Sequence, residues 1–277
     1  MTAEPLHDFS RLCVHTITTK GWELEEAVEH YADAGVSGIT VWRQWLEGRD
    51  PAEAGQRIRA AGLEVVSLCR GGFYPALEEQ TRQQAVEDNK RAIEDAAALG
   101  APLVVLVCGA VPGQSLVESR KQITDGIAAT LPLAESLGVK LAIEPLHPMY
   151  ADDRSAINSL ATANDVCDQL NHPLLGIAFD VYHLWWDPNL EEQTQRTAES
   201  SRLFAYHVCD WMTPTTDLLN DRGLMGEGCI DLRGIRALVE KNGFGGMIEV
   251  EVFSNRWWDK PTAEFLEAIQ ESYLNHT

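Results

Sequence analysis

Four side chains that can bind a metal or transfer a proton each stand at the end of a short apolar run. They are Glu144, Asp180, His207 and Glu251. Burying a carboxylate is costly unless a charge partner or a metal compensates it. An oxygen-rich set with one imidazole suits a divalent cation such as manganese, magnesium or cobalt, and zinc is an alternative. The four residue types therefore predict a divalent metal site, provided that the fold brings them together.

The run that ends at Glu144 has the pattern of a short buried strand. Leu141 and Ile143 point to one side of an extended segment, and Ala142 and Glu144 point to the other. Pro145 then stops the strand. The carboxylate is therefore carried on the tip of a strand, above a small residue. Small residues lie beneath the next two tips as well, namely Ala178 and Ala205.

Segments with strand and helix patterns alternate along the whole chain, and Pro132 indicates a break in one of the helices. The predicted strands are residues 11–15, 38–41, 64–68, 103–107, 140–144, 175–180, 203–207 and 247–251. The predicted helices are residues 24–35, 50–62, 81–100, 115–138, 159–170, 190–200, 231–243 and 262–274.

Strict alternation of this kind indicates parallel strands joined by crossover helices. Eight such units predict an α/β fold, a (β/α)8 TIM barrel, as a single domain over residues 1–277. In such a barrel the C-terminal ends of the strands meet at one mouth, where active sites lie. The four strand-end residues would therefore converge from strands five, six, seven and eight.

The charge balance limits the partners of the protein. Lys and Arg number 22 against 42 Asp and Glu, which gives a formal net charge of −20. Binding to nucleic acid depends on basic surface, so we expect no nucleic-acid partner. No apolar run approaches the length of a membrane span, and the first residues lack a secretory pattern. We therefore expect a cytoplasmic protein that has no membrane partner.

Five short motifs surround the strand-end residues. They are Ile143–Pro145, Phe179–His183, Tyr206–Asp210, Gly226–Asp231 and Ile248–Glu251. Together they resemble the sugar isomerase and epimerase family of xylose-isomerase-like barrels. That family includes ketose 3-epimerases, hydroxypyruvate isomerases and inosose dehydratases, and the resemblance covers nearly the whole chain.

The resemblance implies a role for each residue of the site. Glu144, Asp180, His207 and Glu251 would be the metal ligands. Glu144 and Glu251 would also serve as the catalytic acid and base, on opposite faces of the substrate. His183, three residues after the aspartate, would contact substrate oxygens.

Glu249 is the rival of Glu251 for the last ligand position. Both side chains point to the same side of the strand, but Glu249 lies one layer deeper. The family motif and the position at the strand tip both favour Glu251. Glu249 is then expected to be a buried acid beneath the metal site.

The chain departs from the ketohexose epimerases around the substrate. Tyr150 stands where those enzymes carry a second glutamate, and Thr213 stands where they carry an arginine. The loop after strand five offers His147 and Arg154 instead, and a later loop offers Arg222. We predict that these three side chains bind substrate.

Other aromatic and basic side chains lie in the predicted loops after strand ends. Trp42, Arg70, Trp185 and Trp211 belong to this group. Aromatic faces pack against sugar rings, and arginines bind hydroxyls or carboxylates, so we predict contact with a small carbohydrate. The alternative is that the tryptophans pack the loops together or form a subunit contact in a homo-oligomer.

The loop 226–231 lies where TIM barrels often bind phosphate, ahead of a helix N-terminus that favours anions. Glu227 and Asp231 already place negative charge in this loop. A phosphate would be repelled by them, so we expect a substrate without phosphate.

These features predict a metal-dependent isomerase or epimerase of a sugar or keto-sugar. Glu144 or Glu251 would remove an α-proton to give an enediolate, and the other would return a proton. Loss of a β-substituent from the same enediolate would instead make a dehydratase or lyase acting on an inosose or an oxidised sugar. An endonuclease IV-like phosphodiesterase would need more histidines and a basic face. A non-catalytic sugar-binding barrel would not need four ligands at strand tips.

Overall fold

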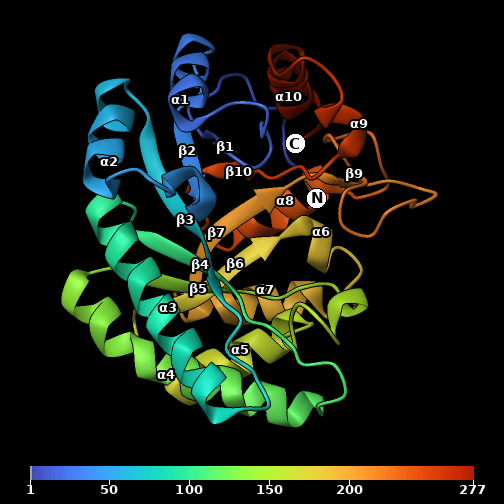
Figure 1. The fold of residues 1–277 in the computed structure, drawn as a ribbon. Helices are drawn as coiled ribbons and strands as arrows, with labels where there is room; N and C mark the ends of the chain where they lie inside the picture. Colours follow the sequence, from blue (N-terminus) through green and yellow to red (C-terminus); the bar gives the residue numbers. More distant parts are fainter. Residues whose placement is uncertain (1) are drawn as a thin grey trace.

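A closed barrel of eight parallel strands with surrounding helices forms the fold in the computed structural model, which describes residues 2–277 (Figure 1). The predicted (β/α)8 TIM barrel is therefore confirmed. In order around the barrel the strands are β1 (Leu12–His15), β10 (Ile248–Val250), β7 (Leu203–Val208), β6 (Leu175–Asp180), β5 (Lys140–Glu144), β4 (Leu103–Val107), β3 (Glu64–Gly72) and β2 (Gly38–Trp42).

The long helices pack around the outside of the barrel. Asp50 shows how their starts are fixed, because its carboxylate accepts hydrogen bonds from the amides of Ala52 and Glu53. The helices are α1 (Leu24–Asp33), α2 (Pro51–Ala60), α3 (Glu79–Leu99), α4 (Leu116–Leu137), α5 (Leu160–Leu170), α7 (Leu190–Glu199), α8 (Leu232–Lys241) and α10 (Thr262–His276).

The break predicted at Pro132 is wrong, because α4 runs through the proline without interruption. A proline removes one hydrogen bond from a helix interior. Ile127, Leu131 and Ala134 are all buried on either side of it. Since most helical stability in proteins comes from packing of the apolar face, these contacts hold the helix together across Pro132.

Short elements follow the C-terminal ends of five strands and build the mouth of the barrel. The sequence patterns did not predict them. They are η1 (Arg43–Leu46) after β2, η2 (Pro148–Tyr150) after β5, α6 (Val181–Leu184) after β6, the antiparallel hairpin β8 (Asp210–Trp211) with β9 (Arg222–Gly223) after β7, and α9 (Asn255–Trp258) after β10.

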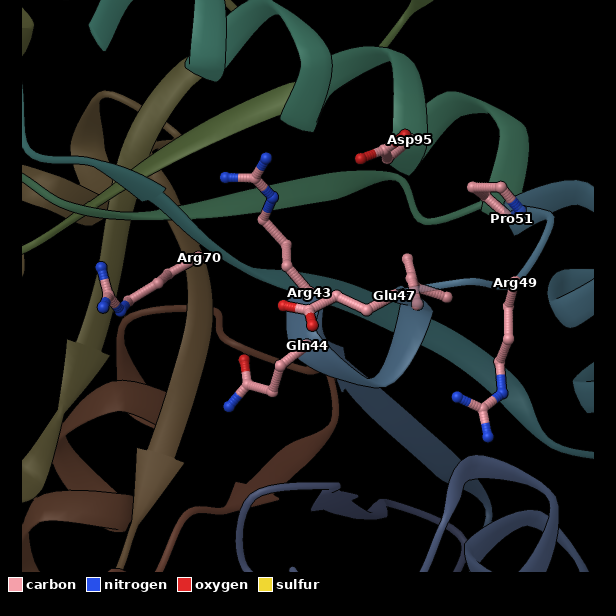
Figure 2. Close-up of a pocket in the computed structure, with 8 residues that line it drawn as sticks. Arg43, Gln44, Glu47, Arg49, Pro51, Arg70 and Asp95 are labelled. Carbon is pink, nitrogen blue, oxygen red and sulfur yellow. The ribbon is translucent and has the colours of Figure 1, made fainter.

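A surface pocket of about 480 Å³ opens beside η1 (Figure 2). Arg43 and Arg70 reach towards one side of it, and Arg49 reaches towards the other. Arg70 lies within β3, which extends to Gly72 and not only to residue 68 as the apolar pattern predicted. In the described part of the chain, no helix has both the length and the apolar character that crossing a membrane requires.

Candidate active site

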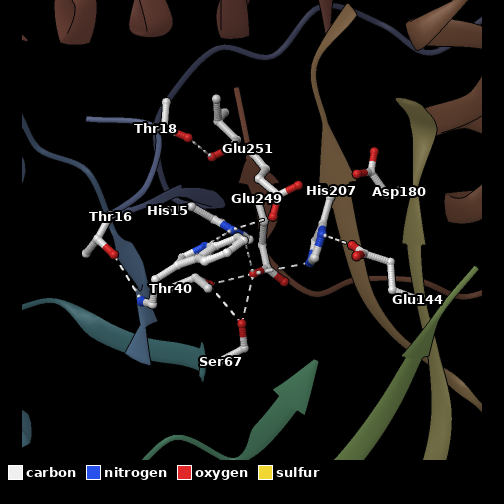
Figure 3. Close-up of polar contacts among 12 residues, drawn as sticks. His15, Thr16, Thr18, Thr40, Ser67, Glu144, Asp180, His207, Glu249 and Glu251 are labelled. Carbon is white, nitrogen blue, oxygen red and sulfur yellow. Dashed lines mark hydrogen bonds and ion pairs between the residues drawn. The ribbon is translucent and has the colours of Figure 1, made fainter. Parts of the chain in front are cut away.

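Four side chains converge at the C-terminal mouth of the barrel (Figure 3). Glu144 and Asp180 end β5 and β6, His207 lies in β7, and Glu251 directly follows β10. Each is at most 4% exposed, and one ligand atom from each lies within 4.8 Å of all the others. The structure therefore brings together the side chains that the strand-end pattern placed at one site.

Arg222 is the positive charge among these carboxylates. Its Nη1 donates to Oε2 of Glu251 at 2.8 Å and to Oδ2 of Asp180 at 3.2 Å. Burial raises the pKa of Asp180 to about 7, although the charge of Arg222 opposes that rise. Burial would also raise the pKa of Glu251, but His15 and Arg222 hold it well below its usual range. Arg222 thus contacts two of the predicted ligands directly. It also lines a small cavity at the barrel mouth, which is described below.

His207 has the surroundings of a metal-binding imidazole. Its Nδ1 lies 3.1 Å from Oε1 of Glu144. Its Nε2 is buried, makes no hydrogen bond to any residue in 2–277, and lies 3.7 Å from Oε2 of Glu249. A histidine that binds a metal usually directs its other ring nitrogen at a carboxylate or a carbonyl. One carboxylate faces each ring nitrogen here, so the donor set fits a divalent metal.

Glu249 lies one layer below these residues and is held by a buried network (Figure 3). Its Oε2 accepts hydrogen bonds from Thr40 at 2.6 Å and from Ser67 at 3.3 Å. The same oxygen lies 3.1 Å from Nε2 of His15, whose Nδ1 lies 3.2 Å from Glu251. Glu249 is therefore occupied by neighbours beneath the site, whereas Glu251 belongs to the converging group.

Sequence reasoning missed His15, although a signal was present. The run Arg11–His15 ends in a histidine in the same way as the run before His207. Burial would lower the pKa of His15, but its hydrogen bonds to Glu249 and Glu251 raise it to about 9. A protonated Nδ1 donates to Glu251 and then cannot accept the 3.3 Å contact from Nε1 of Trp42. The raised pKa favours the contact with Glu251.

A small cavity of about 20 Å³ lies at the carboxylates of Glu144 and Glu251. Such a volume holds about one water molecule. Its lining includes two of the predicted metal ligands, Glu144 and Glu251, four of the residues predicted to bind substrate, and Leu219 of the β8–β9 loop. The predicted carbohydrate substrate is much larger than one water molecule, so its binding would require the lining to move. The four residues are Trp42, Arg154, His183 and Arg222.

The other predicted substrate contacts lie outside this cavity. The ring of Trp211 lies 5.0 Å from the ring of His147, 4.7 Å from Tyr182 and 5.6 Å from Trp185. These contacts pack the aromatic side chains of three segments at the barrel mouth against one another. Trp42 lies in β2, Arg70 in β3 and Trp211 in β8, so the expectation that these three lie in loops is wrong. The local patterns missed the strand extension and the hairpin.

Asp210 fills the loop in which TIM barrels often hold phosphate. Its buried carboxylate accepts hydrogen bonds from the amides of Trp211, Gly226, Gly228 and Ile230, at 2.8 to 3.0 Å. An internal anion thus already occupies the donors that an external anion would use. This arrangement agrees with a substrate that lacks phosphate.

The fold and the converging site define a class of protein. Residues 28–272 match the family model described as the xylose isomerase-like TIM barrel. The chain belongs to this family. Protein SMc04130 from Sinorhizobium meliloti 1021 has a crystal structure that is similar over 97% of this chain and 99% of that one, with 45% identity and a TM-score of 0.94.

Two relatives with named activities are more distant. An inosose isomerase of Bacillus subtilis (strain 168) is 28% identical over 204 residues, which are 72% of this chain and 69% of that protein. A 3-dehydroshikimate dehydratase of Pseudomonas putida is 23% identical over 260 residues, which are 91% of this chain but only 39% of that longer protein. The relatives are thus enzymes of more than one reaction type.

Proposed function

We propose that the chain is a divalent-metal-dependent isomerase or epimerase that acts on a sugar or keto-sugar through an enediolate. One observation carries the proposal: three carboxylates and one imidazole offer ligand atoms within 4.8 Å of one another at the barrel mouth. Similarity to an inosose isomerase supports it. The single domain over residues 1–277 and the cytoplasmic location stay predictions.

In this proposal Glu144, Asp180, His207 and Glu251 hold the metal, and manganese, magnesium and cobalt all suit the ligands. A bound divalent cation would supply Lewis acidity towards the carbonyl of the substrate. Glu144 and Glu251 transfer the protons, because they approach from β5 and β10, with β6 and β7 between them in the barrel. The low pKa of Glu251 keeps its carboxylate ionised.

His183 binds a substrate oxygen as a neutral imidazole. Burial, together with the charge of Arg222, holds the pKa of His183 well below its usual value. Its Nε2 lies 3.3 Å from Nη2 of Arg222, and its ring lines the cavity. Arg154 and Trp42 line the same cavity and complete the inner substrate contacts. His147, Trp185 and Trp211 are placed further out, where an aromatic surface meets the sugar.

A dehydratase is the second candidate. The observation that favours it is the match of 91% of this chain to a 3-dehydroshikimate dehydratase. Both reactions begin with removal of a proton next to a carbonyl, so the same bases serve either one. They differ in whether the enediolate is reprotonated or expels a hydroxyl group.

The test uses metal analysis and exchange in deuterated water. Purified protein is assayed for bound divalent metal and is incubated with an inosose or with 3-dehydroshikimate. Deuterium incorporation without loss of water supports the isomerase, and loss of water supports the dehydratase. Protein that binds no divalent metal and promotes neither process contradicts the proposal.

A further inference from the structure

Arg70 and Arg154 are two half-buried arginines without a counter-ion. Within residues 2–277 neither guanidinium makes a hydrogen bond or an ion pair. They lie instead over aromatic rings, Arg70 at 4.3 Å from the centre of Phe73 and Arg154 at 5.6 Å from that of Tyr150. The chain has 42 acidic residues, so the lack of a partner is notable.

Neighbouring arginines show what the usual pairing looks like. Arg43 lies beside Arg70 in the surface pocket (Figure 2). Its Nη1 donates to Asp88 at 2.8 Å. Arg49, on the other side of that pocket, donates to Glu25 at 3.0 Å. These two charges are compensated, so they are not available to an incoming anion in the way that Arg70 is.

Arg70 and Arg154, the two arginines without a partner, lie near each other at the barrel mouth. Phe73 packs against Gly109, where an added Cβ would lie 2.7 Å from the Cα of Phe73. The amide of Gly109 donates to the carbonyl of Arg154 at 2.9 Å. Burial and the charge of Arg154 lower the pKa of Arg70, as expected for two like charges close together. Arg154 also lines the cavity that contains Glu144.

We propose that the substrate carries a carboxylate, which Arg70 and Arg154 bind while its carbonyl end reaches Glu144 and Glu251. The inference rests on the function proposed for the same site and narrows its substrate to acidic sugars or acidic ring ketones. A planar carboxylate matches the fork of donors on a guanidinium. It would also remove the repulsion between the two arginines.

A carboxylate fits better than a phosphate because of where the two arginines lie. The phosphate position of TIM barrels is in the loops after the seventh and eighth strands. Asp210 already takes the amide donors there. Arg70 lies near the end of β3, and Arg154 lies in the loop between η2 and α5, so both are in another part of the mouth.

The experiment compares matched acidic and neutral ligands on manganese-loaded protein. The pairs are 3-dehydroshikimate with an inosose, and glucuronate with glucose, and dissociation constants are measured by calorimetry. The wild type should prefer the acid in at least one pair. Arg70→Gln and Arg154→Gln should each weaken binding of the acidic ligand on the order of tenfold more than binding of its neutral counterpart, because bonds to charged groups are lost.

Arg49→Gln is the matched control, since it removes an arginine from the same pocket that is already paired, and it should leave the preference unchanged. Absence of any preference for acids, or equal losses for acid and neutral ligands, overturns the inference. A third outcome is that neither acid binds, while inorganic phosphate competes with the neutral ligands and loses this effect in the Arg70→Gln and Arg154→Gln variants. That outcome overturns the inference in favour of a phosphorylated substrate.

Deuterium exchange separates this inference from the proposed function. If the wild type exchanges deuterium into a neutral ligand and shows no preference for acids, only the carboxylate inference fails. If it exchanges deuterium into no ligand of either pair, the proposed function fails.

Discussion

Glu249 and Glu251 point to the same side of β10 and differ mainly in their neighbours. Two hydroxyl groups and a histidine surround Glu249, whereas Arg222 and His15 contact Glu251 beside the other converging ligands. Hydrogen bonds fix Glu249 from several sides, so it cannot approach a substrate. It can, however, fix the ring of His207, which lies 3.7 Å away.

Removal of the basic group from Glu144 or Glu251 should lower the turnover rate but leave the metal bound. Glutamine keeps the size of the side chain and one oxygen ligand but cannot accept a proton. General acid–base catalysis contributes roughly 10²–10⁴-fold to a rate. Glu144→Gln and Glu251→Gln should therefore each lose about that factor in turnover at saturating manganese. Full turnover of Glu251→Gln with metal bound would place the base elsewhere.

Glu249→Gln should weaken metal binding although Glu249 is not among the four proposed ligands. The change removes the negative charge that faces Nε2 of His207. Loss of such a partner of a metal ligand typically costs about 10–100-fold in affinity or activity. Calorimetric titration with manganese measures the effect, with Glu240→Gln on α8 as a control. Equal affinities for the two variants would contradict this role.

At the scale of elements, the β8–β9 hairpin covers the site. The carbonyl of Leu218 in its loop accepts hydrogen bonds from the hydroxyls of Tyr150 and Tyr182. Leu219 and Arg222 from the same segment line the small cavity. Since about 20 Å³ cannot hold a sugar, we expect this hairpin to move when substrate enters and leaves.

Tyr150→Phe and Tyr182→Phe should loosen the hairpin, because each removes a hydroxyl that donates to Leu218. Hydrogen–deuterium exchange of the amides in residues 212–221 should become faster, most of all in the double variant. Tyr206→Phe is the control, since the hydroxyl of Tyr206 is buried without a hydrogen-bond partner in the described chain. Unchanged exchange in the double variant would show that other contacts hold the hairpin.

The elements differ in how far the sequence predicts them. The apolar run that Pro145 ends predicts a barrel strand, and the helical pattern that Gly100 ends predicts an outer helix. Both predictions succeed because burial patterns and stop signals are local. The hairpin and α6 are short and depend on contacts with distant residues, such as Tyr150 with Leu218. The network around Glu249 is also non-local, since Thr40 and Ser67 reach it only after the barrel closes. No spacing in the sequence indicates those bonds.

At the scale of the whole molecule, the proposed metal site joins distant parts of the chain. Its ligands come from four adjacent strands, β5, β6, β7 and β10, and the last of these closes the barrel against β1. Three acids are gathered there in a protein that already carries a net charge of −20. A cation in the site would relieve the repulsion in the folded state only.

Manganese should therefore raise the melting temperature, and excess chelator should reverse the rise. At a metal concentration of 100 Kd the stabilisation is about 2.7 kcal/mol. Differential scanning calorimetry measures the shift. Asp180→Asn removes one ligand charge and should reduce the shift at the same manganese concentration. An equal shift in both proteins would mean that the metal binds elsewhere.

The carboxylate of Asp210 is an anion bound by four backbone amides, in the way that a protein binds a phosphate from solution. If this carboxylate is removed, we expect an anion from solution to bind to the same amides. Asp210→Ala would leave these amides without an acceptor, at about 1–3 kcal/mol for each group that water cannot reach. Millimolar phosphate should then restore the melting temperature of the variant and leave that of the wild type unchanged. Calorimetry follows this rescue, with chloride as the comparison salt. Rescue by phosphate but not by chloride would show that an external anion can replace the carboxylate of Asp210.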